Sequence, residues 1–243
     1  MRESGWGPTK RDYSTSTFPH ATTVTCECKD GYDWIISSPV GEPLNPYTQP
    51  ATRNGDMDAA RVSSLMDQIQ FMALAGAVHC DVRHSNMVIN SADDKVMLID
   101  HGATLPCGHS MRTKDYHGTS HTASSAVVDM MLTGHAGSCE ATSFMDLQSA
   151  VQALYLMRHP TAFQGVADAF DAIDSHNWVA LKAWWAAQST CATPGWKHIL
   201  KAAAGSYKGA PLESYAERLA VVRYLLSLEF SAVELEENES TAA

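Results

Sequence analysis

Three side chains in one short stretch have the types and spacing that phosphoryl-group chemistry requires. Asp81 is followed five residues later by Asn86 and fourteen residues after that by Asp100, with Gly102 close behind. Phosphoryl transfer needs a carboxylate that orients the acceptor hydroxyl, and a divalent metal that neutralises the phosphate charge. Because Mg²⁺ prefers carboxylate and amide oxygens, Asp81 is the candidate base, and Asn86 and Asp100 are the candidate metal ligands. Gly102 permits the turn behind Asp100.

The flanking segments predict the elements that position these residues. Apolar residues at helical spacing predict a helix from Asp58 to about Gly76, just before Asp81. The apolar runs Met87–Asn90 and Lys95–Ile99 predict a β-hairpin between Asn86 and Asp100. The candidate residues therefore lie in the loops at the two ends of this hairpin.

The rest of the chain begins with a little β structure and continues mainly as helix. Apolar runs on both sides of Lys29-Asp30-Gly31 predict an N-terminal hairpin. Residues 103–143 are mostly irregular, which is typical of a functional or a mobile segment when it occurs inside a compact domain. Helices are expected over Ala123–Leu132, Phe144–Met157, Val166–Gln188 and Leu212–Phe230.

The motifs resemble those of protein kinases in order and spacing. The stretch from His79 to Asn86, HCDVRHSN, resembles the catalytic loop H-R-D-x-K-x-x-N, and Asp100-His101-Gly102 resembles D-F-G. The likeness covers roughly residues 33–157. Three flanking segments resemble the last N-lobe strand and hinge, the G-T that closes an activation segment, and the opening of the central C-lobe helix: Trp34–Leu44, Gly118-Thr119 and Asp146–Ser149.

This resemblance to the protein-kinase-like superfamily implies an α+β fold, mainly the helical C-lobe, with a truncated or vestigial N-lobe. It implies an ATP- and Mg²⁺-dependent phosphotransferase that acts on Ser or Thr of proteins. Asp81 and Arg83 would be catalytic, Asn86, Asp100 and Gly102 would hold the cofactor, and Asn86 and Asp100 would bind the metal. The expected divisions are a flexible arm, an N-lobe remnant with the hinge, the C-lobe, and a disordered acidic tail: residues 1–22, 23–44, 45–230 and 231–243.

Several departures from the kinase pattern keep a second function open. Cys80 replaces the arginine of the catalytic loop, His101 replaces the phenylalanine of D-F-G, and no A-P-E follows Gly118-Thr119. Upstream, Gly5-Trp6-Gly7 is followed by Lys10 where a third glycine would stand, and Lys29 fits a hairpin turn better than a phosphate-binding strand. The phosphate clamp of a kinase is therefore not found, and the alternative is a pseudokinase that works as a binding or scaffold module.

Two other interpretations of the same residues remain open. Arg83 can pair with Asp81 instead of steadying a transferred phosphate. His79, Asp81, His84 and His101 together superficially resemble a metallohydrolase cluster, although the ligand spacings of such families are not met. A metal-dependent hydrolase is thus a distant third candidate.

Composition and charge restrict the partners. The 243 residues carry a net charge of −10. General binding to nucleic acid or to an anionic membrane is not expected, because no excess of basic residues could displace counterions. No apolar leader or long apolar run occurs, and the six cysteines form no repeated pair, so we expect a cytoplasmic protein with reduced thiols, a nuclear location being also compatible. The expected partners are ATP and a protein substrate or binding partner.

Overall fold

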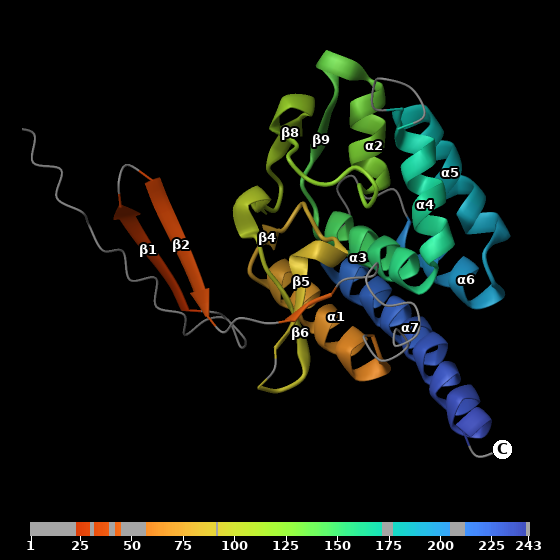
Figure 1. The fold of residues 1–243 in the computed structure, drawn as a ribbon. Helices are drawn as coiled ribbons and strands as arrows, with labels where there is room; N and C mark the ends of the chain where they lie inside the picture. The colour runs from red at the N-terminus through yellow and green to blue at the C-terminus, as the bar shows by residue number, and fades with distance from the viewer. Residues whose placement is uncertain are drawn as a thin grey trace, which may run out of the picture.

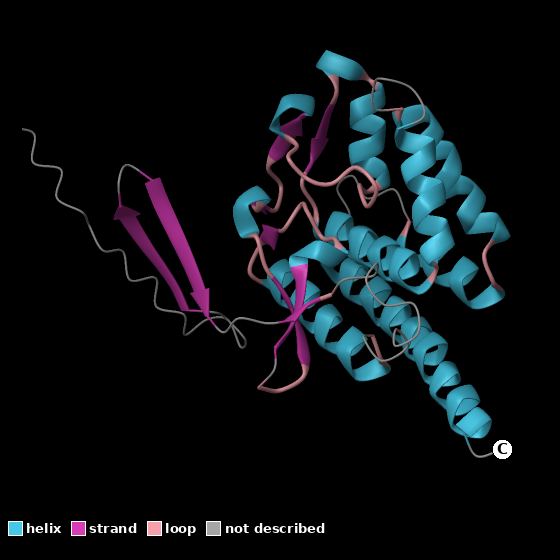
Figure 2. Cartoon of the chain, in the orientation of Figure 1, coloured by secondary structure: helices cyan, strands magenta, loops and turns pink. Residues whose placement is uncertain are grey.

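The computed structural model describes the residues that carry the candidate site and most of the helical part. These are residues 23–29, 32–38, 42–44, 57–90, 92–171, 177–204 and 212–241. The architecture is α+β, mostly helical with short antiparallel strands, as the sequence predicts (Figure 2). The predictions for residues 1–22, including Gly5, Gly7 and Lys10, concern a segment outside the described residues.

One buried helix forms the centre of the helical part. Helix α3 is covered by α1, α4, α6 and α7, which pack against it (Figure 1). Every residue from Ser143 to Leu156 is buried. Five of these buried residues are polar: Ser143, Asp146, Gln148, Ser149 and Gln152. The described helices are α1 (Ala59–Leu74), α2 (Ser125–Leu132), α3 (Ser143–Arg158), α4 (Pro160–Asp171), α5 (Trp178–Cys191), α6 (Pro194–Ala203) and α7 (Leu212–Thr241).

The described strands are short and pair in four small antiparallel sheets. Sheet β3-β5-β6 contains the hairpin predicted between Asn86 and Asp100, and β4 pairs with β7 on either side of that hairpin. Pro43 lies in the edge strand β3, a position that tolerates the missing N–H. The bounds are β1 (Thr23–Lys29), β2 (Tyr32–Ser38), β3 (Glu42–Pro43), β4 (Ala77–Val78), β5 (Met87–Asn90), β6 (Lys95–Leu98), β7 (Leu105–Pro106), β8 (Ser110–Arg112) and β9 (Ser138–Glu140).

Helix α1 begins where the sequence predicts and covers the edge of β6. Asp58 caps its N-terminus by accepting the N–H of Arg61 at 2.7 Å. Ser64 Oγ accepts the N–H of Val96 at 2.9 Å, and Gln68 Oε1 accepts that of Leu98 at 2.8 Å. These two polar side chains satisfy backbone donors of β6, which is an edge strand among the described strands. The predicted apolar stripe of this helix is buried as expected: Val62, Leu65, Met66, Ile69 and Met72.

The prediction of one helix over Val166–Gln188 is wrong. Helix α4 ends at Asp171, and α5 begins at Trp178 and packs against α4. Asn177 starts the new helix, because its Oδ1 accepts the N–H of Ala180 at 2.9 Å. A capping asparagine favours a fresh helix start over continuation. Helix α6, with proline in its first turn, was not predicted at all.

Helix α7 is longer than the sequence predicts. It runs to Thr241 and so includes most of the stretch expected as a disordered tail from residue 231. Its earlier turns bury apolar residues, among them Tyr215, Leu219, Val222 and Leu226. Glu and Leu are good helix formers, so a helix fixed by this packing continues through the acidic residues.

The N-terminal hairpin forms as predicted. Strands β1 and β2 pair in antiparallel register with Lys29 opposite Tyr32, and they make a two-stranded sheet of their own. Lys29 is therefore the last strand residue before the turn, which agrees with its interpretation as a hairpin lysine.

Candidate functional site

The loop that carries Asp81 is anchored to the central helix α3. Asp146 lies in the first turn of α3. Its carboxylate accepts the backbone N–H of His79 at 2.6 Å and that of Cys80 at 3.0 Å. Burial raises the pKa of Asp146 to about 7, and the two N–H donors oppose that shift. Cys80 takes a left-handed backbone conformation with φ of 64°. The loop is thus pinned at two successive amides just before Asp81.

Asp81 is held by donors from two different loops. Its Oδ1 accepts the backbone N–H of Thr119 at 2.7 Å, and its Oδ2 accepts Nδ2 of Asn86 at 2.8 Å. The same Asn86 nitrogen donates to the Asp81 carbonyl at 2.9 Å. Both side chains are buried, with Asp81 8% and Asn86 3% exposed. The spacing of five residues is therefore realised as a direct contact, and the carboxylate has a fixed orientation.

Arg83 lies beside the same carboxylate. Its Nε is 3.3 Å from Asp81 Oδ2, and its side chain is 36% exposed. The structure thus contains the Asp81–Arg83 pair that the sequence left as one of two interpretations.

The loop that carries Asp100 lies directly against the Asp81 loop. Nε2 of His79 is 3.1 Å from the Ile99 carbonyl, and the N–H of Ile99 donates to the Asn86 carbonyl at 2.9 Å. Asp100 follows in a left-handed conformation, with φ 61° and ψ 65°, and is exposed. A non-glycine residue held in this region indicates stored strain of the kind that clusters at functional sites.

Gly102 lies close to the carboxylate it follows. A Cβ placed on Gly102 would be 3.3 Å from Asp100 Oδ1. A larger residue would therefore crowd the oxygen that the sequence assigns to a metal. Gly102 itself has no positive φ, so the backbone conformation at this position does not require glycine.

The segment that supplies Thr119 approaches the Asp81 loop very closely. A Cβ on Gly118 would be 2.2 Å from the Cys80 carbonyl oxygen and 2.7 Å from Tyr116 Oη, so only glycine fits. Tyr116 Oη donates to the Thr119 carbonyl at 2.9 Å, and burial raises the pKa of Tyr116. Gly118-Thr119 was predicted from a motif, whereas Tyr116 belongs to no motif and was not predicted.

The segment after Thr119 is held against α3 by hydrogen bonds to a glutamine side chain. Both the N–H and Oγ of Ser125 donate to Oε1 of Gln148 at 3.0 Å. Ser124 caps α2, with its Oγ 3.4 Å from the N–H of Val127. A neutral glutamine on α3 thus takes a role for which the sequence offered no candidate.

The residues fit the expected metal in type. Asn86 uses its amide nitrogen on Asp81, so the carbonyl oxygen remains as the donor for a cation, and Asp100 offers an exposed carboxylate. Among the described residues, no three or more His, Cys, Asp or Glu side chains gather in a metal-binding group. Mg²⁺ bound here would therefore take its other ligands from phosphate and water, as is usual for this ion.

The metallohydrolase interpretation has little support. His79 is fully buried, and both ring nitrogens have backbone neighbours: Nδ1 is 3.3 Å from the N–H of Asp81, and Nε2 faces the Ile99 carbonyl. Burial, and next the nearby His101 ring at 4.9 Å between centroids, lower the pKa of His79. His79 therefore acts as a neutral bridge between the two loops and is not free to bind a metal.

Neither the membrane-helix criterion nor the comparisons with known proteins assign the chain to a class. Within the part of the chain that the structure describes, no helix combines the length and apolar character needed to cross a membrane. No family model matches the chain, and a search of curated proteins finds no match either.

Proposed function

We propose that the chain is a protein-kinase-like phosphotransferase that uses ATP and Mg²⁺ and acts on Ser or Thr of proteins. The observation that carries this proposal is the double hold on Asp81: the Thr119 amide on one oxygen and the Asn86 amide on the other. A carboxylate fixed in this way is positioned to orient a hydroxyl nucleophile.

The proposed chemistry assigns one step to each residue. Asp81 takes the proton of the acceptor hydroxyl while the oxygen of that hydroxyl forms a bond to the γ-phosphorus of ATP. The bond between the γ-phosphorus and the bridging oxygen of the β-phosphate breaks, and ADP leaves. Arg83 lies at the same carboxylate and is partly exposed, so it could offset charge on the transferred group. Asn86 and Asp100 would hold Mg²⁺, which when bound neutralises the phosphate oxygens.

One further feature supports a kinase-like arrangement of the site. Residues that resemble separate kinase motifs, although far apart in the chain, meet at one place: His79 with Ile99, Asp81 with Thr119, and Cys80 with Asp146. A chance motif match gives no reason for these contacts. The kinase-like fold assignment rests on this convergence.

The alternative function is a catalytically impaired pseudokinase that binds a partner. It is favoured by the N-terminal part, where the described strands β1 and β2 form only a two-stranded sheet and Lys29 ends a strand at the turn. Neither feature supplies the lysine that contacts phosphates in kinases. The two proposals differ in whether bound ATP is turned over.

Transfer of the labelled γ-phosphate of ATP to an acceptor, measured with and without Mg²⁺, separates the two functions. We expect Mg²⁺-dependent transfer to casein, to the chain itself, or slowly to water. Asp81→Asn should lower this rate by about a hundredfold or more, the usual loss for a missing general base. Asp129→Asn is the matched control, since that carboxylate pairs with Lys182 on the surface. If ATP binds but none of the three acceptors is labelled, the phosphotransferase proposal is rejected in favour of the binding module.

A further inference from the structure

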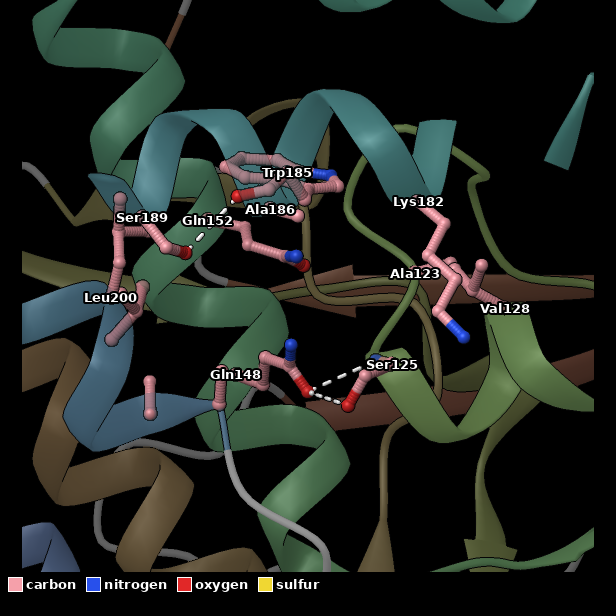
Figure 3. A pocket seen from close by; sticks show the side chains of 13 residues that line it. Ala123, Ser125, Val128, Gln148, Gln152, Lys182, Trp185, Ala186, Ser189 and Leu200 are labelled. Carbon is pink, nitrogen blue, oxygen red and sulfur yellow. Dashed lines mark hydrogen bonds between the residues drawn. The ribbon is translucent and has the colours of Figure 1, made fainter. Parts of the chain in front are cut away.

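A cavity in the helical part lies apart from Asp81 and has no role in the proposed function. It has a volume of about 200 Å³ and lies between α2, α3, α5 and α6 (Figure 3). Val128, Val151 and Leu200 give it apolar walls, and Trp185 forms one side. A dry apolar cavity of about 150 Å³ already suffices to bind benzene, so this one has room for a small ring system.

One polar atom in this cavity has no partner. Oε1 of Gln152 is buried without a hydrogen bond, and the whole side chain is only 3% exposed. Figure 3 shows the amide of Gln152 pointing into the space between α3 and α5. An unsatisfied buried acceptor is costly, so a native one calls for an explanation. A ligand that donates a hydrogen bond at this position provides one.

A second amide bounds the same cavity. Gln148 directs Oε1 to Ser125, and Figure 3 shows its amide nitrogen turned toward the cavity. The Trp185 ring is held by a residue that does not line the cavity, because its Nε1 donates to the His121 carbonyl at 3.1 Å. The indole wall is therefore preformed, and the polar residues that line the cavity come from α2, α3 and α5: Ser125, Gln148, Gln152, Lys182 and Ser189.

We propose that this cavity binds a compact, flat, mostly apolar molecule that carries an N–H donor, with the donor bonded to Gln152 Oε1. Indole has the chemistry of this class: a fused aromatic ring with a single N–H. The inference goes beyond the phosphotransferase proposal and does not depend on it. It rests on the cavity, on the orphaned acceptor, and on the ring-sized space beside Trp185.

Indole and indene form a matched pair of probes, because they share size and shape and differ in the N–H. Calorimetry and saturation-transfer NMR on the full chain should show indole binding about three- to tenfold more tightly than indene, the range expected for one net hydrogen bond. Gln152→Leu should remove that preference and leave both probes with the affinity of indene. Since the substitution also removes an unsatisfied buried acceptor, the melting temperature should not fall.

A second variant tests the location. Ser189→Leu should abolish binding of both probes, because Ser189 lines the cavity and the larger side chain fills it from α5. The hydrogen bond that the substitution removes is local, since the Ser189 hydroxyl donates to the Trp185 carbonyl of its own helix. Thr190→Leu, on the exposed face of the same helix, should bind as the wild type does. The proposal is overturned if neither probe binds, which would mean a cavity that holds only water. It is equally overturned if the two probes bind alike, or if binding survives Ser189→Leu.

Discussion

The carboxylate of Asp146 accepts the backbone N–H of His79 at 2.6 Å, although 67 residues separate the two in the chain. The second oxygen takes the N–H of Cys80. The candidate site is therefore built on the most buried helix, and its loop cannot move without breaking hydrogen bonds in the core. The geometry of the site therefore depends on the stability of the whole fold as well as on the local sequence.

Replacing the anchor should destabilise the whole fold. Asp146→Asn keeps the size of the side chain but exchanges one acceptor oxygen for an NH₂ group, which then faces a backbone N–H. We expect a loss of about 1–3 kcal/mol in the free energy of unfolding, the usual cost of an unsatisfied buried donor. Urea denaturation measures it. Asp129→Asn, on an exposed ion pair, should stay within about 0.5 kcal/mol of the wild type, and equal losses in the two variants would contradict the anchoring role.

The same carboxylate predicts a pH dependence. Burial raises the pKa of Asp146 to about 7 from an unfolded value of 3.8, so the folded state binds the proton more tightly. This contribution to stability is fully present below about pH 4 and is lost as the pH rises through about 7. The free energy of unfolding, measured from pH 5 to pH 8, should therefore fall more steeply with pH in the wild type than in Asp146→Asn. Parallel profiles would show that Asp146 does not titrate in this range.

The close approach at Gly118 predicts a severe effect of one methyl group. In Gly118→Ala the new Cβ meets the Cys80 carbonyl, which is backbone and cannot rotate away. We expect a loss of about 1–3 kcal/mol, as for overpacking in a core, and loss of the Thr119–Asp81 bond. Gly134→Ala is the comparison: there the added Cβ meets nothing, and only the left-handed φ of 67° costs about 1 kcal/mol. Thermal unfolding with activity as second readout checks both, and full activity in Gly118→Ala would contradict the contact.

The start of α5 gives a prediction away from the site. Asn177→Ala should lower stability by about 1 kcal/mol, because the Ala180 N–H loses its capping acceptor. Asn177→Asp restores an acceptor and should recover most of that loss. Denaturant unfolding of the two variants measures the difference. If alanine and aspartate behave alike, the cap contributes nothing and α5 starts for another reason.

Local patterns in the sequence predicted the parts of the site that lie close in the chain. The α1 stripe and the hairpin predicted over Met87–Asn90 and Lys95–Ile99 follow from periodicity, and the structure contains both. The motif marked Asp81 and Asn86 but did not predict the hydrogen bond between them. The contact of Tyr116 with Thr119 could not be predicted in this way. Nothing in the residue type or spacing distinguishes a tyrosine that donates to a backbone carbonyl from one that fills a core.

Long-range relations were harder to predict, and their physical reasons differ. Asp146 was noted as part of a motif, but its role as an acceptor for two loop amides depends on how α3 is buried. The division of α4 from α5 depends on one capping side chain, Asn177, amid otherwise helix-compatible residues. The extension of α7 shows the reverse case, where packing of earlier turns carries a helix into a polar segment.

The central claim is that Asn86 and Asp100 hold the metal of a nucleotide complex beside Asp81. Titration calorimetry with ATP, in the presence and absence of Mg²⁺, tests it most directly. We predict binding that requires Mg²⁺ and that weakens at least about tenfold in Asp100→Asn. Asp93→Asn, on the turn of the same hairpin, should bind as the wild type does. Absence of binding, or equal affinity in Asp100→Asn and the wild type, would contradict the claim.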